Sequence, residues 1–447
     1  MCVLRRDGQL PVLRFFMGAK RQRFLATHDA RKPRAAAGDC GAIPRVVNRK
    51  GSRFMSSALR FVIYSQDGMG LGHLRRNTLI GQRILDAAPG SNILLIADSP
   101  VAPFFSLPSG MDFLKLPSIQ KIGPGQWQPT HLGTSGQDVQ VLRAALLRSV
   151  FQFYKPDLLL VDHMPVGARG ELTSALDVLK QARPTCAVVL GLRDILDAKD
   201  VIARVWQTEG AYDALRKYYH RVLIYGSSQV FDSCGSYNLP VPSQGIHYCG
   251  YVVNPGPVRP ASDVRHALRA GSRKLVFVSA GGGHDGYTLM RTYVRAVRLL
   301  ESRVDFLTLM AVGVNLAPEL LRELEVEAKG LPIQVRSHVS DSLSHIAAAD
   351  LVVCMAGYNT LSEVLSLKKR ALVVPRAGPS AEQRMRAGLF ANRGLLEMLD
   401  PSDLSPEVLA HRLTVALQEK EDGPVQDRGI RMNGAGQAAS CLLELLQ

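Results

Sequence analysis

The sequence has no apolar run long enough to span a bilayer, few aromatic residues and no closely spaced pair of cysteines. Its first apolar run, Leu10 to Met17, is interrupted by Arg14, and no other stretch approaches the roughly 18 residues that a membrane-spanning helix needs. The seven cysteines are scattered without a C-x-x-C pair, which argues against a disulfide framework and a zinc site. These absences predict a cytoplasmic protein, either free or attached peripherally to the inner face of the cytoplasmic membrane.

The positive charge of the chain is concentrated near its N-terminus. The formal net charge is +15, but residues 1–54 hold thirteen Lys and Arg against three Asp, or +10, which leaves 15 − 10 = +5 for the rest. A mildly basic body suits anionic substrates or a membrane surface, and we expect no nucleic-acid partner. Residues 1–54 also show no helical or strand periodicity. We predict that they are either a disordered basic leader or a segment ahead of the true start at Met55.

The remaining residues alternate between apolar strands and amphipathic helices, twice over. A first series of predicted strands begins at Leu59, and a second begins at Arg273. Such alternation is typical of parallel sheets covered by helices on both faces. We therefore predict an α/β protein with two Rossmann-like, doubly wound domains facing a central cleft. The predicted division is a first domain at 55–250, a Pro- and Gly-rich linker at 251–260, a second domain at 261–430 and a C-terminal helix within 431–447.

The first glycine-rich loop runs from Asp67 to His73, between a predicted strand and a predicted helix. Gly70 and Gly72 allow a ligand to approach the backbone near the positive end of the helix. One alternative is an ordinary tight turn. Another is a dinucleotide fingerprint, for which Asp98 has the spacing of the ribose-binding acid. The position of His73 at the helix start favours a different use, because its imidazole would face the cleft as a general base.

Two further glycine loops occur in the second half. The loop Gly281–Gly286 offers several backbone N–H groups to a phosphate, with Gly282, Gly283 and His284 as the predicted contacts, although an ordinary loop stays an alternative. In the other loop Gly357 ends a strand, and Asn359 or Thr360 is the expected cap of the next helix. Glu363, one turn inside that helix, is either a simple first-turn acid or the acceptor of two ribose hydroxyls.

Two aspartates lie where predicted strands of the first domain end. Asp162 is followed by His163, and Asp194 is preceded by Arg193. Ligands of open α/β sheets bind at the carboxyl ends of the strands. Asp162 and Asp194 are therefore candidates to assist His73 or to replace it as the base, and each is alternatively a helix-capping acid.

The stretch Ala349–Ala387, ADLVVCMAGYNTLSEVLSLKKRALVVPRAGPSAEQRMRA, resembles the donor site of MurG-type glycosyltransferases of family 28. That family shows a strand, S/A-G-x-x-T-x-x-E, a second strand ending in V-P, and a helix start rich in D/E-x-Q. The glycine loops at Asp67–His73 and Gly281–Gly286 fall in the matching order, so the resemblance spans about residues 59–417. It implies the two-Rossmann-domain fold called GT-B.

The resemblance also implies roles for individual residues. Glu363 would bind the ribose of a uridine nucleotide, and Gly357 and Thr360 would line its diphosphate. Glu382 and Gln383 match the positions that recognise sugar hydroxyls, and His73 matches the histidine near the reaction centre. The chain departs from the family pattern in having Ala356 for a serine, His284 and Asp285 for a serine and a glutamine, and Glu382–Gln383 for paired glutamines.

The expected activity is transfer of a sugar from a nucleotide-sugar donor, with UDP-GlcNAc as one candidate, to a hydroxyl group with inversion. Backbone amides and helix N-termini would stabilise the departing diphosphate, so we expect no metal and no cofactor. The acceptor is a saccharide, a lipid-linked molecule or a small molecule, and Arg75, Arg76 and Arg143 suit an anionic one. The alternatives are a UDP-sugar epimerase, a non-catalytic nucleotide-sugar-binding protein and an NAD-type dehydrogenase.

Overall fold

The computed structural model describes residues 58–66, 72–100, 102, 106–123, 126–254, 256–283, 285–300, 304–418 and 429–447. These residues belong to one compact unit, Ser57–Gln447. The predicted leader at 1–54 lies outside the described residues, and so do two predicted ligand contacts, Gly70 and His284. Among the helices of the described residues, none is long and apolar enough to cross a membrane.

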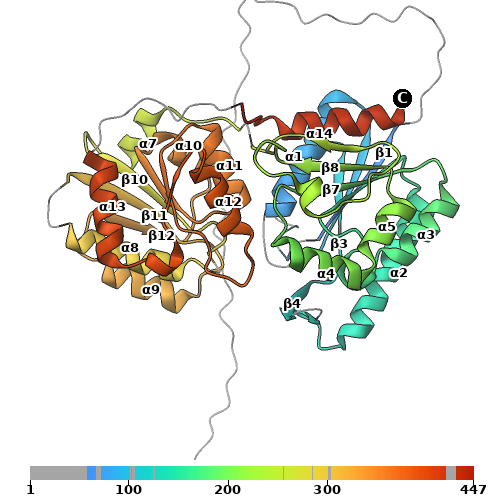
Figure 1. Ribbon diagram of the computed structural model, residues 1–447, viewed down its shortest axis with the longest axis horizontal. Helices are drawn as coiled ribbons and strands as arrows, with labels where there is room; N and C mark the ends of the chain where they lie inside the picture. Colours follow the sequence, from blue (N-terminus) through green and yellow to red (C-terminus); the bar gives the residue numbers. More distant parts are fainter. Residues whose placement is uncertain are drawn as a thin grey trace, which may run out of the picture. The chain divides into compact units, whose positions relative to one another are not determined.

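The first half of the chain forms a seven-stranded parallel sheet (Figure 1), with the strand order β3-β2-β1-β6-β7-β8-β9. Its central strands are apolar and buried along almost their whole length, as strands covered on both faces should be. The strands are β1 Arg60–Ser65, β2 Asn92–Ala97, β3 Met111–Lys115, β6 Leu158–Asp162, β7 Ala187–Arg193, β8 Arg221–Tyr225 and β9 Ile246–Tyr248.

Side chains alternate between the two faces of this sheet and build a separate core on each. Phe61 and Ile63 of β1 belong to one cluster of buried residues, whereas Val62 and Tyr64 belong to another. A short antiparallel hairpin, β4 Ile119–Gly123 and β5 Gln126–Pro129, lies apart from the sheet. The helices of this half are α1 Gly72–Ala87, α2 Gly136–Tyr154, α3 Thr173–Ala182, α4 Lys199–Glu209, α5 Ala211–Tyr218 and α6 Ser233–Ser236, with a 3-10 turn at Ala168–Gly170.

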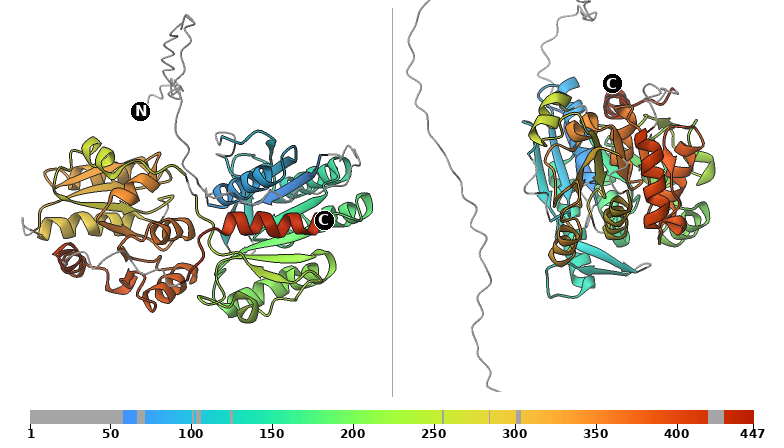
Figure 2. Two further views of the ribbon diagram at one scale, coloured as in Figure 1. Left: turned by 90° about the horizontal axis from the view of Figure 1, so that it is seen from above. Right: turned by 90° about the vertical axis from the view of Figure 1, so that its left-hand side faces the viewer.

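The second half forms a six-stranded parallel sheet, ordered β12-β11-β10-β13-β14-β15, with helices on both of its faces (Figure 2). The strands are β10 Lys274–Ser279, β11 Phe306–Ala311, β12 Ile333–Arg336, β13 Leu351–Cys354, β14 Ala371–Val373 and β15 Glu397–Met398. The helices are α7 Ala261–Ala267, α8 Tyr287–Leu299, α9 Pro318–Glu327, α10 Ser342–Ala348, α11 Tyr358–Ser366, α12 Glu382–Ala391 and α13 Pro406–Gln418. Two such sheets confirm the predicted α/β class.

The strand orders place a topological switch point in each sheet. The chain builds outward from β1 to β3 and then returns to add β6 on the other side of β1; in the second sheet it does the same around β10 and β13. Crevices form outside the carboxyl ends of the strands at such points, and ligands of open α/β sheets bind there. Predicted site residues follow β1, β10 and β13, and Asp162 ends β6. Others lie elsewhere, because Asp194 follows β7, and Glu382 and Gln383 follow β14.

The last helix, α14 Gly434–Leu443, returns to the first half and packs against α1 (Figures 1 and 2). Two backbone hydrogen bonds join Tyr251 to the start of α14 and the segment before it. Tyr251 N donates to Arg431 O (2.8 Å), and Gly434 N donates to Tyr251 O (2.9 Å). The sequence predicted a helix here but not its partner. The predicted domain bounds stay predictions, although the two sheets do end and begin on either side of residues 251–260.

Candidate active site

A cavity of about 440 Å³ is lined by residues from both halves of the chain. The first half contributes Gly72, His73 and Arg193, which follow or end β1 and β7. The second half contributes the loops after β10 and β13 and the first turns of α11. A second cavity of about 610 Å³ adjoins it and shares Arg75 and Glu363. The glycine loops predicted to bind ligand therefore meet at one site.

His73 and Asp162 form a hydrogen-bonded pair on the wall of the smaller cavity. His73 Nδ1 is 2.5 Å from Asp162 Oδ2, and the His73 side chain retains 15% exposure while Asp162 is fully buried. Burial by itself would raise the pKa of Asp162, but the Arg76 guanidinium and then His73 outweigh it and hold that pKa well below its usual range. Asp162 is therefore a permanent carboxylate that orients the imidazole and can stabilise its protonated form.

Asp162 is held in place by two further side chains of α1. Arg76 donates from Nη2 to both oxygens of Asp162 at 2.9 Å, and Asn77 donates to Oδ2 at 3.1 Å. The Arg76 guanidinium also lies over the rings of Tyr225 and Tyr358, at 5.3 and 5.6 Å from their centroids. Arg76 is 2% exposed and its Nη2 is held by Asp162, so although it lines both cavities it is not the exposed contact for an anionic acceptor that the sequence suggested.

Arg143 is equally unsuited to that predicted role. It is fully buried and donates from Nε and Nη2 to the two oxygens of Glu171, each at 2.6 Å. Its Nη1 contacts Asp98 at 3.4 Å, and Gln66 donates to the same Asp98 oxygen at 3.0 Å. Asp98 is thus a buried ion-pair partner with 1% exposure, and it cannot reach the ribose of a bound dinucleotide. This geometry disfavours the dehydrogenase alternative.

The loop after β10 is pressed against the loop after β11. Gly283 and Gly313 both have φ angles in the left-handed region, 91° and 99°. A Cβ on Gly313 would lie 2.4 Å from the backbone nitrogen of Gly283, and one on Gly283 would lie 2.5 Å from the Val312 oxygen. Asn315 N donates to Gly282 O at 2.9 Å, which fixes the two loops together. Gly281 and Gly282 line the cavity, where their backbone is accessible to a phosphate.

Helix α11 presents its N-terminus to the same cavity. Gly357 is the N-cap and makes no side-chain capping bond, so the prediction that Asn359 or Thr360 caps the helix is wrong. The helix begins at Tyr358, two or three residues before the start that those caps imply, and Asn359 instead donates to the carbonyl of Gly72 at 3.4 Å. Gly357, Asn359 and Thr360 all line the cavity. The open N–H groups of the first turn and the helix dipole suit an anionic ligand here.

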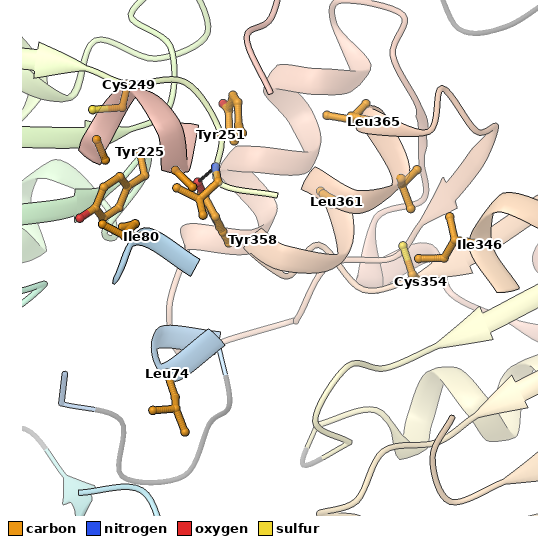
Figure 3. Close-up of a cluster of buried hydrophobic side chains, with 14 of the residues drawn as sticks. Leu74, Ile80, Tyr225, Cys249, Tyr251, Ile346, Cys354, Tyr358, Leu361 and Leu365 are labelled. Atoms are coloured by element: carbon orange, nitrogen blue, oxygen red, sulfur yellow. Dashed lines mark hydrogen bonds between the residues drawn. The ribbon is translucent and has the colours of Figure 1, made fainter. Parts of the chain in front are cut away.

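Tyr358 anchors the start of α11 to the segment that joins the two halves. Its hydroxyl accepts a hydrogen bond from Val252 N at 2.9 Å, and its ring packs near Tyr251 in a continuous buried cluster (Figure 3). Leu74 of α1 and Leu361 of α11 belong to the same cluster. The elements that carry His73 and Gly357 are therefore supported by one apolar core.

Glu363 lies where the two cavities adjoin. Burial raises the pKa of its carboxyl, against the opposing influences of Arg75 and a hydrogen bond with Ser342. The residue lines both cavities, one helical turn beyond the N–H groups of Gly357 to Thr360. A nucleotide whose phosphates sit at that N-terminus would bring its ribose towards Glu363.

Asp194, Glu382 and Gln383 are placed differently from expectation. Arg386, 1% exposed, binds Asp194 through Nη2 (2.7 Å) and Nε (3.0 Å), and its Nη2 also donates to Glu382 Oε1 at 2.9 Å. Burial opposes the ionisation of Glu382, but Arg193 and Arg386 lower its pKa to about 2. The Gln383 side-chain oxygen accepts from Arg376 N at 3.1 Å. None of the three lines the smaller cavity, and their predicted contacts with substrate stay predictions.

Two arginines of this region were not predicted to belong to the site. Arg386 was not singled out, although its position four residues after Glu382 allows an i,i+4 ion pair on one helix face. Arg193 was noted only as the neighbour of Asp194, yet it lines the cavity and pairs with Glu382 across 2.8 Å. Contacts over 189 and 192 positions in sequence leave no local pattern.

Residues 275–436 match the profile of the glycosyltransferase family 28 C-terminal domain. An uncharacterized glycosyltransferase of Methanopyrus kandleri is 30% identical over 146 residues, 33% of this chain and 39% of that protein. The UDP-N-acetylglucosamine–N-acetylmuramyl-(pentapeptide) pyrophosphoryl-undecaprenol N-acetylglucosamine transferase of Brucella canis is 28% identical over 215 residues, 46% of this chain and 55% of that protein. The chain thus spans about half the length or less of these relatives.

Solved structures show the same fold over most of the chain. MurG of Acinetobacter baumannii has a TM-score of 0.52 at 15% identity and covers 86% of this chain and 95% of its own. A putative UDP-N-acetylglucosamine 2-epimerase from Listeria monocytogenes has a TM-score of 0.59 at 14% identity, covering 87% and 96%. These likenesses confirm the GT-B fold, and the profile match confirms the MurG-like, family 28 resemblance. The matched residues include the loops at Gly281–Gly283 and Gly357–Glu363.

Proposed function

We propose that the chain transfers a sugar from a uridine-nucleotide sugar to a hydroxyl group, with inversion and without a metal ion. The observation that carries this proposal is the His73–Asp162 pair, which shares a cavity with the open N-terminus of α11. A base on one wall and an anion site on the other are what an in-line displacement at the anomeric carbon needs. The family 28 domain and the names of the relatives support the same chemistry.

In this mechanism His73 accepts the proton of the acceptor hydroxyl as its oxygen bonds to the anomeric carbon. The bond from that carbon to the phosphate oxygen breaks, and the electron pair remains on the departing diphosphate. Asp162, ionised and fixed by Arg76 and Asn77, stabilises the imidazolium that forms. Closure of the cavity around the donor would keep water from competing as acceptor.

The donor's diphosphate would lie against the N–H groups of Gly357 to Thr360 and the loop at Gly281–Gly282. Glu363 would accept hydrogen bonds from the ribose hydroxyls. Among the described residues, no group of three or more His, Cys, Asp or Glu side chains could hold a metal. The metal-independent route, the donor sugar and the N-acetylhexosaminyl specificity remain part of the proposal.

The acceptor side is proposed only as a class. A saccharide, lipid-linked or small-molecule alcohol would enter from the first half, where Arg75 is exposed beside the cavity. Peripheral contact with the cytoplasmic face of a membrane would deliver a lipid-linked acceptor to it. Arg75 is the one arginine of the three predicted for an anionic acceptor that is exposed.

Two measurements test the proposal. Calorimetry with UDP, ADP, GDP and dTDP should show binding of UDP in preference to the others, and absence of any nucleotide binding would contradict the proposal. UDP release from UDP-GlcNAc and UDP-glucose should then require an acceptor, supplied as lipid-linked saccharides, free sugars and alcohols. Conversion of the UDP-sugar without any acceptor would instead identify an epimerase, whose fold this chain shares. Donor binding without turnover under all conditions would identify a binding protein.

A further inference from the structure

Arg193 brings a positive charge from the first half into the cavity. It is the last residue of β7, its side chain is 18% exposed, and it lines the cavity together with His73 and Gly357. Arg76, the neighbouring arginine on α1, is 1% exposed and committed to Asp162. Arg193 is therefore, with the exposed Arg75, a guanidinium that can contact a ligand that reaches His73.

The hydrogen-bonding capacity of Arg193 is not used up. Its Nη1 binds Glu382 Oε1, but that oxygen also accepts from Arg386 Nη2, so two guanidinium groups share one acceptor atom. Its Nε is buried and has no hydrogen-bond partner among the described residues. Nδ1 of His163, the residue that follows the neighbouring strand β6, is also buried without a hydrogen-bond partner among the described residues. Because Arg193 lines the cavity, a ligand there can complete the hydrogen bonding of its guanidinium.

The charge of Arg193 acts close to the general base. The ring of His163 lies 5.3 Å from the ring of His73, centroid to centroid. Burial, and then the positive charge of Arg193, lower the pKa of His163 well below its usual range, so that this second imidazole stays neutral. Arg193 therefore lines the same cavity as the proposed base and the α11 N-terminus, and the scissile bond of a donor would lie in that cavity.

We propose that Arg193 binds the β-phosphate of the donor and stabilises the negative charge that this phosphate gains as the sugar leaves. The inference rests on the proposed glycosyl transfer. When the bond between the anomeric carbon and the phosphate oxygen breaks, the electron pair stays on that oxygen, and Arg193 and the α11 N–H groups share the charge. The fork of an arginine suits two phosphate oxygens, and Glu382 holds it in place before the donor binds.

The test compares UDP with UMP, because only UDP carries the β-phosphate. Calorimetry on the full chain gives the ratio of the two affinities for the wild type, Arg193→Gln, Arg193→Lys and Glu382→Gln. Loss of a charge-assisted bond should lower the UDP/UMP ratio by about tenfold or more in Arg193→Gln, with UMP affinity unchanged. Arg193→Lys, which keeps the charge but not the fork, should fall between. Arg384→Gln is the matched control, an exposed arginine of α12 paired with Asp400.

The outcomes separate the candidate roles. Glu382→Gln should lower the ratio less than Arg193→Gln does, because it keeps the guanidinium in the cavity and removes only the carboxylate that holds it. An equal loss in both variants would show that the ion pair merely holds the fold, and would overturn the proposal. An unchanged ratio in Arg193→Gln would overturn it as well. Should Arg193→Gln fail to fold, an unchanged UDP/UMP ratio in Arg193→Lys would overturn the proposal instead. A wild-type chain that binds neither nucleotide refutes the proposed function itself, whereas normal UDP binding with an unchanged ratio refutes only the role of Arg193.

Discussion

His73 and Asp162 are 89 positions apart in sequence, and their side chains are 2.5 Å apart in the structure. Each was a candidate base from its position beside a strand end. Asp162 is fully buried and its oxygens accept hydrogen bonds from Arg76 and Asn77, so a substrate hydroxyl cannot reach it. His73 alone retains a surface towards the cavity, so we assign it the proton transfer.

Replacing His73 by alanine should lower turnover about a hundredfold or more, because general-base catalysis typically contributes that much. UDP affinity should change little, since none of the proposed phosphate and ribose contacts involves His73. The measurement is steady-state UDP release with acceptor present, alongside calorimetry with UDP. His266→Ala, an exposed histidine on α7, is the control. Turnover that stays within a few-fold of wild type would move the base to another group.

Glu363→Gln should weaken UDP binding by about 1 to 3 kcal/mol, the cost of lost hydrogen bonds to a charged group. The same change should raise the melting temperature at pH 7. Burial raises the pKa of Glu363, which means that folding is opposed by its ionisation, and the cost is present above the raised pKa and vanishes below the unfolded value of 4.5. The gain in melting temperature should therefore shrink as the pH falls towards 4. Unchanged UDP affinity in a folded variant would remove Glu363 from the site.

At the scale of elements, the strands and helices followed from sequence more closely than their ends did. Helix α2, for example, begins at Gly136 because Ser135 caps it by accepting from Asp138 N. The predicted caps of α11 were wrong because the helix begins at Tyr358, with Gly357 in extended backbone as its N-cap. The strands β3 and β9 and the β4–β5 hairpin were not predicted. They are short, and β3 and β9 lie at the sheet edges, where the apolar signal is weak.

The contact between the two glycine loops gives a prediction at this scale. Gly313→Ala should destabilise the chain and weaken UDP binding, because its Cβ would meet Gly283 N at 2.4 Å and displace the phosphate loop. The expected cost is about 1 to 3 kcal/mol for the strained φ alone, with the clash in addition. Gly330→Ala isolates the backbone term, since its φ is 80° and a Cβ there meets nothing within 4 Å. Chemical denaturation and UDP calorimetry measure both effects. Equal losses of unfolding free energy in the two variants would show that the glycine loops move apart for the added Cβ at no further cost.

At the scale of the whole molecule, the buried ion cluster around Arg386 connects the two sheets. Asp194 follows β7 of the first sheet, whereas Arg386 and Glu382 lie on α12 of the second half, and Arg386 Nη1 also donates to Ala356 O at 3.1 Å. Arg386 thus holds the residue just before the Gly357 loop. We interpret Asp194 and Glu382 as residues that position the donor loop.

Arg386→Met should cost about 3 to 5 kcal/mol of unfolding free energy at pH 7, because it leaves buried carboxylates without their partner. The double variant Arg386→Met, Asp194→Asn should recover part of that loss by removing one stranded charge. Urea denaturation of both variants measures the difference. A loss below about 1 kcal/mol would mean that water or another cation replaces the guanidinium, as at a surface ion pair.

Lowering the pH should weaken the ion pairs of Glu382 in this cluster over a defined pH range. The pKa of Glu382 is lowered from 4.5 to about 2, so its ionised form favours the folded state. That contribution is fully present above 4.5 and is lost as the pH falls from 4.5 through 2. The difference in unfolding free energy between wild type and Glu382→Gln should therefore be constant from pH 7 to 5 and then decline. A difference that already changes between pH 7 and 5 would contradict the assignment.

The sequence by itself determined the α/β class, the two series of strands, the glycine loops and the family resemblance, because all of these depend on patterns within about ten to forty residues. Only the tertiary structure decided which residues share a cavity. It paired His73 with Asp162, buried Asp98 and Arg143 in an ion cluster, returned α14 to α1, and turned Asp194 and Glu382 towards Arg386. The physical reason is that a buried charge needs a partner, and the partner is fixed by strand order and packing at distances that leave no local pattern in the sequence.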